Sequence, residues 1–186
     1  MANCDVSITS LDPSCEALKK TGGIKQKFWI GKLNEVVTTL DVDGYVDSVS
    51  MVSASPVNTL SYVIGKQFKH NAQETGVFGE NVNTINQIVN AILYYYTAEE
   101  RTAVEGYINL EDIVLFVQTA GANSQVLMYG YDNGLKCTAF DATIGALLND
   151  NTAATCTFSG EQYGLPKVLK IGSSVQDVVS ALDALV

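Results

Sequence analysis

Residues 113–164 constrain the fold of this chain more than any other stretch. Four runs in it are rich in valine, leucine, threonine and aromatic residues: 113–118, 125–131, 135–140 and 155–161. Asp132-Asn133-Gly134 separates the second run from the third. Because Asn-Gly supplies the two positive-φ residues of a type I′ turn, we predict a β-hairpin there. An antiparallel sheet follows, in a stretch that carries no recognisable catalytic group.

Further strands are expected on the N-terminal side of this stretch. The candidate segments are 24–37, 45–55, 60–74 and 81–96. Pro56 ends the second segment, and Gly76 and Gly79 are expected to break the chain after the third. The last segment interleaves asparagines with isoleucine, valine and leucine. Asparagine and β-branched residues are poor helix formers, which favours one long strand there.

A first helix is predicted directly after this long segment. Thr97-Ala-Glu-Glu100 matches a capping box, in which the threonine and the glutamate each accept a hydrogen bond from the other's backbone N–H. The helix should cover residues 98–106, with Val104 and Ile108 facing the core.

A second helix is predicted at the C-terminal end of the sequence, over residues 175–186. Ser174 is its N-cap and Asp177 stands three residues on. Apolar residues recur at helical spacing from Val175 to Leu185. The pattern leaves two alternatives open: the helix folds back on its own sheet, or it docks as an arm on a neighbouring subunit.

This order of elements predicts a mainly β (α+β) fold. We expect an antiparallel β-sandwich or open barrel with one packed helix and a C-terminal amphipathic helix. The predicted organisation is an N-terminal arm at 1–23, a β-domain at 24–168 and the C-terminal helix at 169–186. A chain of 186 residues is long enough for one such domain with a real core.

Charge and hydropathy argue against two classes of protein, those that bind nucleic acid non-specifically and those that span a membrane. The net charge of −9 opposes non-specific binding to phosphate backbones. No stretch approaches the roughly 20 apolar residues of a membrane span, so none is expected. The first residues lack the basic and apolar regions of a signal peptide, which predicts synthesis and assembly in a cytoplasm.

The cysteines do not form a metal motif. Cys4, Cys15, Cys137 and Cys156 include no C-x-x-C pair, and zinc sites usually show such close pairs. Cys137 and Cys156 lie in expected strands, where a free cysteine usually packs as a small hydrophobe. Cys4 and Cys15 flank a turn-like segment and are able to pair, but nothing in the sequence requires it.

No catalytic, cofactor-binding or metal-binding residue is predicted. His70 is the only histidine, and its polar neighbours favour a solvated, structural role. Asp41 and Asp43 are more typical of a turn than of a calcium loop, because the late glutamate of such a loop is missing. The tyrosines at 94–96 suit either a stacking platform for sugars or bases, or packing at a core or interface.

A set of short motifs, taken in order, is more specific than any one of them. The set comprises Gly22-Gly-Ile-Lys-Gln-Lys-Phe-Trp-Ile30 behind an opening with Cys4 and Cys15, Glu74-Thr-Gly-Val-Phe78, Thr97-Ala-Glu-Glu-Arg101, Ile113-Val-Leu-Phe-Val117, Tyr129-Gly-Tyr-Asp-Asn-Gly-Leu135 and Thr157-Phe-Ser-Gly-Glu161. This order resembles virion structural proteins of tailed bacteriophages with a tail-tube-like fold, and is most similar to those of crAss-like and related phages of Bacteroidetes hosts. The resemblance covers most of residues 22–164. The helix after Gly172 lies outside the pattern.

The resemblance implies a ring-forming, non-enzymatic subunit of a virion tail or connector. In that family, sheets of neighbouring subunits join edge to edge around a DNA channel, and long hairpins reach the adjacent ring. The implied partners are further copies of the chain and neighbouring tail or portal proteins, with viral DNA passing during genome ejection. Acidic charge along the channel would keep phosphates from sticking. Two alternatives stay open: a head-associated decoration or fibre-anchoring protein, and a carbohydrate-binding β-sandwich that uses the tyrosines at 94–96.

Overall fold

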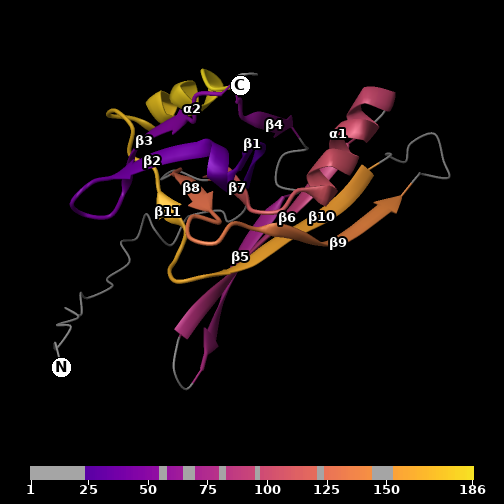
Figure 1. Ribbon diagram of the computed structural model, residues 1–186, viewed down its shortest axis with the longest axis horizontal. Helices are drawn as coiled ribbons and strands as arrows, with labels where there is room; N and C mark the ends of the chain where they lie inside the picture. The colour runs from indigo at the N-terminus through magenta and orange to yellow at the C-terminus, as the bar shows by residue number, and fades with distance from the viewer. Residues whose placement is uncertain are drawn as a thin grey trace.

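The protein folds into two β-sheets packed face to face, with two helices and a small two-stranded sheet around them (Figure 1). The structure is a computed structural model that describes residues 24–54, 58–64, 70–79, 83–94, 97–120, 124–143 and 153–186. It confirms the predicted fold class, a mainly β protein with antiparallel sheets and few helices. The predicted N-terminal arm and the Cys4–Cys15 alternative lie outside the described residues.

The first sheet has five strands in the spatial order β11, β8, β7, β1, β4, and every pair is antiparallel. These strands are β1 Ile24–Lys32, β4 Ser61–Ile64, β7 Ile113–Thr119, β8 Val126–Tyr129 and β11 Lys167–Val168. A short 3₁₀ turn, Leu33–Glu35, leads from β1 into a separate hairpin. The strands of that hairpin are β2 Val36–Leu40 and β3 Val46–Met51.

The second sheet has four antiparallel strands in the order β5, β6, β10, β9. They are β5 Asn71–Phe78, β6 Asn83–Tyr94, β9 Lys136–Thr143 and β10 Ala153–Gln162. The long strand expected at 81–96 is therefore confirmed as β6, and it pairs with β10 over ten residues. Asparagine in this segment does not break the ladder because alternate side chains point to opposite faces of the sheet.

Strand β7 is buried on both faces and separates two hydrophobic clusters. Ile113, Leu115 and Val117 point into the cluster between the two sheets, which also contains Phe158 of β10. The alternating residues Val114 and Phe116 point the other way, into a second cluster. All five β7 residues from 113 to 117 are at most 1% exposed, as expected for a central strand covered on both sides.

The second cluster lies under the hairpin β2–β3 and under helix α2, Val175–Asp183 (Figure 1). Val178 and Leu182 of α2 are buried against β-strand side chains, including Trp29. The predicted capping box is present, since Ser174 and Asp177 each accept a hydrogen bond from the other's backbone N–H. Of the two alternatives for this helix, the structure shows the fold-back on its own sheet.

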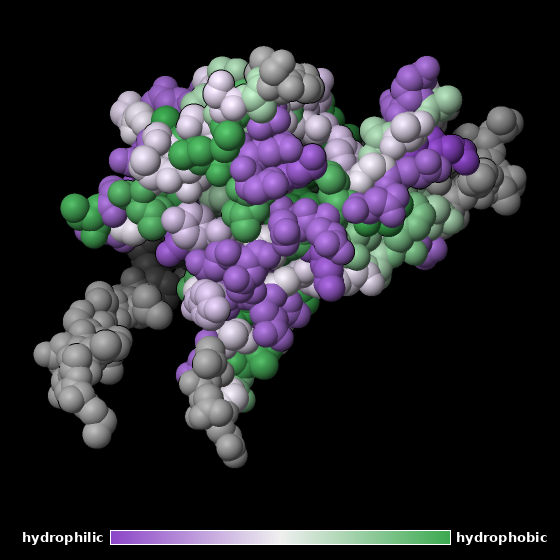
Figure 2. All heavy atoms as spheres, in the orientation of Figure 1, coloured by the Kyte–Doolittle hydropathy of each residue, from purple (hydrophilic) through white to green (hydrophobic). Residues whose placement is uncertain are grey.

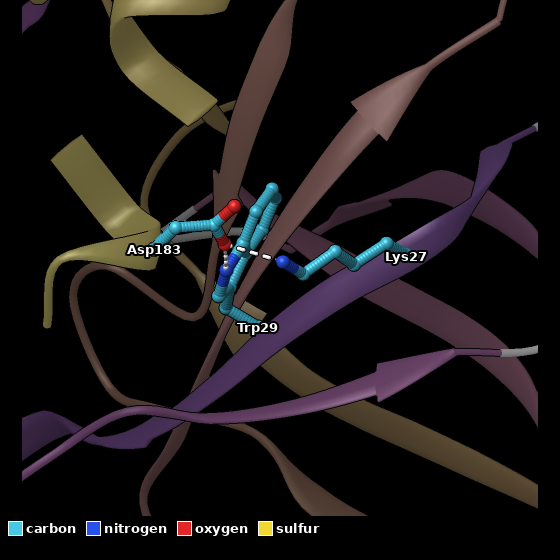
Figure 3. A network of polar contacts seen from close by, with 3 residues as sticks. All are labelled: Lys27, Trp29 and Asp183. Carbon is cyan, nitrogen blue, oxygen red and sulfur yellow. Dashed lines mark hydrogen bonds and ion pairs between the residues drawn. The ribbon is translucent and has the colours of Figure 1, made fainter. Parts of the chain in front are cut away.

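A polar contact fixes α2 to β1 (Figure 3). Asp183 Oδ1 accepts a hydrogen bond from Trp29 Nε1 at 2.8 Å and forms an ion pair with Lys27. Burial alone would raise the pKa of Asp183, but the hydrogen bonds from Lys27 and Trp29 and the Lys27 charge outweigh it and lower the pKa. The contact satisfies the indole N–H at the edge of the second cluster.

Helix α1, Ala98–Asn109, covers one end of the space between the two sheets (Figure 1). Its capping box is also confirmed: Thr97 Oγ1 accepts from the Glu100 N–H at 3.1 Å, and Glu100 Oε2 accepts from the Thr97 N–H at 2.9 Å. Val104 is buried and Ile108 packs against the same cluster, as predicted.

The predicted type I′ hairpin at Asn133-Gly134 is wrong. Strands β8 and β9 on either side of it belong to different sheets, so the turn is a crossover. Of its residues, only Gly134 has a positive φ, +67°, whereas a type I′ turn needs two. A Cβ at position 134 would lie 2.5 Å from the Asp112 Cα, so both the backbone angle and the space require glycine here.

Two buried glutamines explain why this segment crosses between sheets. Gln162 Oε1 accepts hydrogen bonds from the N–H groups of Asp132 and Asn133, at 2.9 and 3.0 Å, and its Nε2 donates to the Gly134 carbonyl at 2.8 Å. Gln87 Oε1 accepts from the Gly130 N–H at 2.9 Å. These side chains of β10 and β6 replace the ladder partners that a hairpin strand would supply.

The single strand predicted at 60–74 is also wrong. Its first part is β4 in the five-stranded sheet, and its last part is the start of β5 in the four-stranded sheet. Gly76, expected to break the chain, lies inside β5 and pairs with Ile85. The sequence does not give the partner of either part, so only tertiary pairing reveals where the chain changes sheets.

We predict that Gln162→Ala lowers the free energy of unfolding by about 2 kcal/mol, because three hydrogen bonds are lost and two turn N–H groups lose their acceptor. Urea unfolding followed by Trp29 fluorescence measures the change. The matched control is Gln73→Ala, an exposed glutamine on β5, with an expected change below about 0.5 kcal/mol. Equal effects of the two substitutions would contradict the role assigned to Gln162.

We also predict that Asp183→Ala loosens the attachment of α2 and costs about 1 kcal/mol of stability, a value reduced by the partial exposure of the carboxylate. Because the pKa of Asp183 is lowered in the folded state, the contribution is present above pH about 4 and is lost as the pH falls below it. Urea unfolding at pH 7 and at pH 3 measures it. Gln176→Ala, an exposed residue of the same helix, is the control and should change neither value.

Candidate assembly surface

The four-stranded sheet ends in two strands that each lack a neighbour on one side among the described residues. These edge strands are β5 and β9. In β5 only Ala72 is even half-buried, and every other side chain is exposed. An edge strand presents a row of free N–H and C=O groups, which is a template for pairing with another strand. Both edges are thus chemically able to continue the sheet into another chain.

The outer face of this sheet carries a ladder of amide and hydroxyl side chains. Asn90 Nδ2 donates to Asn71 Oδ1, and Thr157 Oγ1 donates to Asn90 Oδ1, both at 2.7 Å, so one row spans three strands. The paired residues Gln73–Ile88 and Thr75–Asn86 lie on the same face. Neither hydrophobic cluster includes a side chain from this face. Within the part of the chain that the structure describes, the sheet is therefore covered on its inner face only.

The β5–β6 hairpin projects from the opposite end of the molecule to α1 (Figure 1). Pairing between β6 and β10 stops at Ile85, whereas β5 continues to pair with β6 as far as Phe78 and Asn83. Phe78 is 83% exposed and its neighbour Val77 is 43% exposed. Hydrophobic side chains are visible beside the end of this hairpin in Figure 2.

The expectation that His70 is solvated is wrong, since it is only 2% exposed. Its Nδ1 accepts a hydrogen bond from the Ile92 N–H at 3.0 Å, where β6 runs past the start of β5. The ring meets Phe28 edge to face, with the centroids 5.1 Å apart. Within the described part of the chain, Nε2 has no hydrogen-bond partner of good geometry. His70 is thus a neutral ladder cap and packing residue.

Other titratable groups in the core also have structural roles. The Tyr129 hydroxyl donates to Glu74 Oε1 at 2.5 Å. Burial is the larger cause, and this carboxylate the smaller cause, that raise the pKa of Tyr129. Burial and the neighbouring Cys137 raise the pKa of Cys156 to about 12, so its thiol stays protonated. Both cysteines are free and pack with the inter-sheet cluster, as predicted.

The aspartates at 41 and 43 and the tyrosines at 94–96 were the other residues considered for binding. Asp41 Oδ1 accepts from the N–H groups of Asp43 and Tyr45, at 2.9 and 2.8 Å, which is the predicted turn. The described residues contain no group of three or more metal-ligating side chains. Tyr94 lines a hollow beside α1 with Tyr62 and Tyr107, while the other two tyrosines of the 94–96 run lie outside the described residues.

Sequence reasoning missed Gln87 and Gln162, the two buried glutamines. A glutamine at an inward position of an otherwise apolar alternation is a detectable signal, since Gln87 alternates with Val89 and Ala91. The sequence alone does not give the hydrogen-bond partner of Gln87, because the turn that Gln87 binds lies 43 residues away. None of the described helices is long and apolar enough to cross a membrane.

Comparisons of the chain with protein-family models, with curated proteins and with solved structures gave no match.

The burial of His70 predicts a dependence of stability on pH. Burial lowers the pKa of His70 below its usual 6.5. An interaction with the Gln26 backbone raises the pKa and so opposes part of this effect. The unfolded chain therefore binds a proton in a range where the folded chain does not. The free energy of unfolding should be constant above pH about 7.5 and fall as the pH drops below about 6.5. Urea unfolding between pH 8 and pH 5 measures it.

His70→Phe tests the assignment, because the sequence has only one histidine. The variant should lose the pH dependence in this range and should be less stable at pH 8 by about 1–3 kcal/mol, since the Ile92 N–H loses its acceptor. Wild-type stability that stays flat from pH 8 to pH 5 would contradict the prediction.

Proposed function

We propose that this protein is a non-enzymatic structural subunit of a bacteriophage virion that assembles into a ring or tube of the tail or connector, through which DNA passes. One observation carries the proposal: the described residues leave both edges and the outer face of the four-stranded antiparallel sheet uncovered. Side-by-side joining of β5 of one copy to β9 of the next would continue the sheet and remove both free edges. Such a head-to-tail contact closes into a ring where the rotation from one copy to the next divides a full turn.

The chemistry of the outer face supports passage of DNA without capture. Among the residues that share this face by register, Lys136 is basic, while Asp141 and Glu161 are acidic. Most of the remaining positions hold amides, hydroxyls or small apolar groups. Binding to phosphates needs clustered positive charge, which this face and the net charge of −9 do not provide. The face therefore suits a wall past which a polyanion slides.

The proposal places the protein in the virion, with further copies of the chain and neighbouring tail or portal proteins as partners. The motif order quoted for residues 22–164 supports this assignment, and so does the fold, since a tail-tube-like subunit requires antiparallel sheets with long strands. A decoration or fibre-anchoring role uses the same sheet edges differently, and would give discrete small oligomers and no rings or tubes.

Edge blocking tests the proposal with Ala142→Pro on β9. Ile92 donates its N–H towards the β5 side, and N–H directions alternate along and between paired strands. The Ala142 N–H consequently points away from β10, to the free edge, so proline there blocks pairing with a new strand but removes no existing ladder bond. We expect wild type to form rings or tubes and Ala142→Pro to stay monomeric and folded.

Negative-stain microscopy and sedimentation velocity measure assembly, and circular dichroism checks the fold. The matched control is Val42→Pro in the β2–β3 turn, where Val42 is fully exposed and proline suits the turn position. This control should assemble like wild type. Persistent wild-type monomers at high protein concentration, or unchanged assembly of Ala142→Pro, would overturn the proposal.

A further inference from the structure

Two free cysteines lie close together in the four-stranded sheet. Cys156 of β10 is fully buried, and Cys137 of β9 is half-buried. Both side chains pack with the inter-sheet cluster, so they share the inner face of the sheet. The register pairs Cys137 with Phe158, two residues after Cys156. The two cysteines are therefore diagonal neighbours on adjacent strands (Figure 1).

A β-bulge brings the two thiols together. The register of β9 and β10 shifts just before Phe158, which leaves Thr138 of β9 without an opposite residue on β10. The Cys137 thiol leans over this bulge, because its Sγ donates a hydrogen bond to the Ala139 carbonyl at 3.4 Å. Ala139 lies on the side of the bulge towards Cys156, and the two cysteine side chains share a hydrogen bond. The fold thus holds a pair of thiols in contact.

The two thiols differ in reactivity. Burial first, and then the neighbouring Cys137, raise the pKa of Cys156 to about 12, so the Cys156 thiol is protonated at neutral pH. Cys137 is the more exposed of the two and lies on an edge strand. Cys137 is therefore the thiol that meets an oxidant first, and Cys156 is the thiol that reacts with the product.

We propose that Cys137 and Cys156 form a redox-sensitive pair, which stays as two thiols in a reducing compartment and closes to a disulfide in an oxidising one. The oxidant is a small disulfide of the glutathione type. The Cys137 sulfur attacks one sulfur of glutathione disulfide, the S–S bond breaks, and one glutathione leaves as a thiol with the Cys137 proton. Cys156 loses its proton to solvent and attacks the Cys137 sulfur, and the second glutathione leaves and takes up a proton. Two protein thiols are oxidised, and one glutathione disulfide is reduced to two glutathiones.

The bulge also explains why the bond should be reversible. A disulfide needs its sulfur atoms about 2 Å apart, which is closer than two hydrogen-bonded thiols. The strands have to adjust, and they are able to do so here because β9 is an edge strand and Thr138 has no opposite residue on β10. A bond that requires such an adjustment is reduced more easily than an unstrained one. A switch is therefore expected, and not a permanent structural bond.

Closure of the pair would fix strand β9. Among the described strands, β9 pairs with β10 alone, so the disulfide adds a covalent link to the ladder that holds it. The link closes the loop between residues 137 and 156 and removes freedom from the unfolded chain. The bond itself does not require assembly. In the proposed assembly, on which this last consequence rests, oxidation would fix the strand that meets the next copy.

Oxidation of the purified full chain tests the pair. The chain is incubated with glutathione disulfide at pH 8, free thiols are blocked with N-ethylmaleimide, and digestion at aspartate cuts the chain at Asp141, between the two cysteines. Mass spectrometry should find the peptide of Cys137 joined to the peptide of Cys156, and dithiothreitol should separate them. Unlinked cysteines, a persistent glutathione adduct on Cys137, or bonds from this pair to Cys4 or Cys15 would overturn the proposal.

Glutathione buffers separate a switch from a permanent bond. The pair should be reduced where glutathione thiol dominates and linked where glutathione disulfide dominates. A bond that survives in the first buffer would contradict the switch. The Cys4→Ser/Cys15→Ser double variant is the matched control and should behave like wild type in both buffers.

Hydrogen exchange measures the effect on β9. Exchange of the β9 amides should slow by about tenfold or more in the oxidised protein, because the link restricts opening of the edge strand. Cys137→Ala, at a half-buried position, should fold like wild type and show no slowing with oxidant. Unchanged or faster exchange in oxidised wild type would overturn the assigned effect. A monomeric wild type gives the same readouts, so failure of the proposed assembly is a separate result.

Discussion

Burial of β7 on both faces is the constraint on which the rest of the structure depends. Five consecutive apolar residues, 113–117, cannot be covered by one layer, because their side chains alternate between two faces. One face requires the four-stranded sheet and α1, and the other requires the β2–β3 hairpin and α2. The C-terminal helix is therefore part of the core of this chain, and Asp183 fixes its last turn to β1.

The four-stranded sheet therefore packs against β7 with its inner face, whereas no described residue covers its outer face. Its inner face supplies apolar side chains such as Val89 and Phe158 to the inter-sheet cluster. Its outer face has no apolar layer on it in the described chain, and its polar side chains bond to one another across strands, as Asn71, Asn90 and Thr157 do. A surface with its hydrogen bonds already made gains little from binding a ligand, which suits a wall better than a receptor.

Element type was predictable from sequence where a local rule decided it. Both capping boxes and the long strand β6 follow from spacing and propensity. The conformation of the Asn133-Gly134 turn was not predictable from the sequence. Its local preference for a hairpin is overridden by Gln162, a residue about 30 positions away that supplies the turn's hydrogen bonds. The prediction that His70 is solvated was wrong for the same reason. Its sequence neighbours are polar, but the side chain contacts residues of β1 and β6.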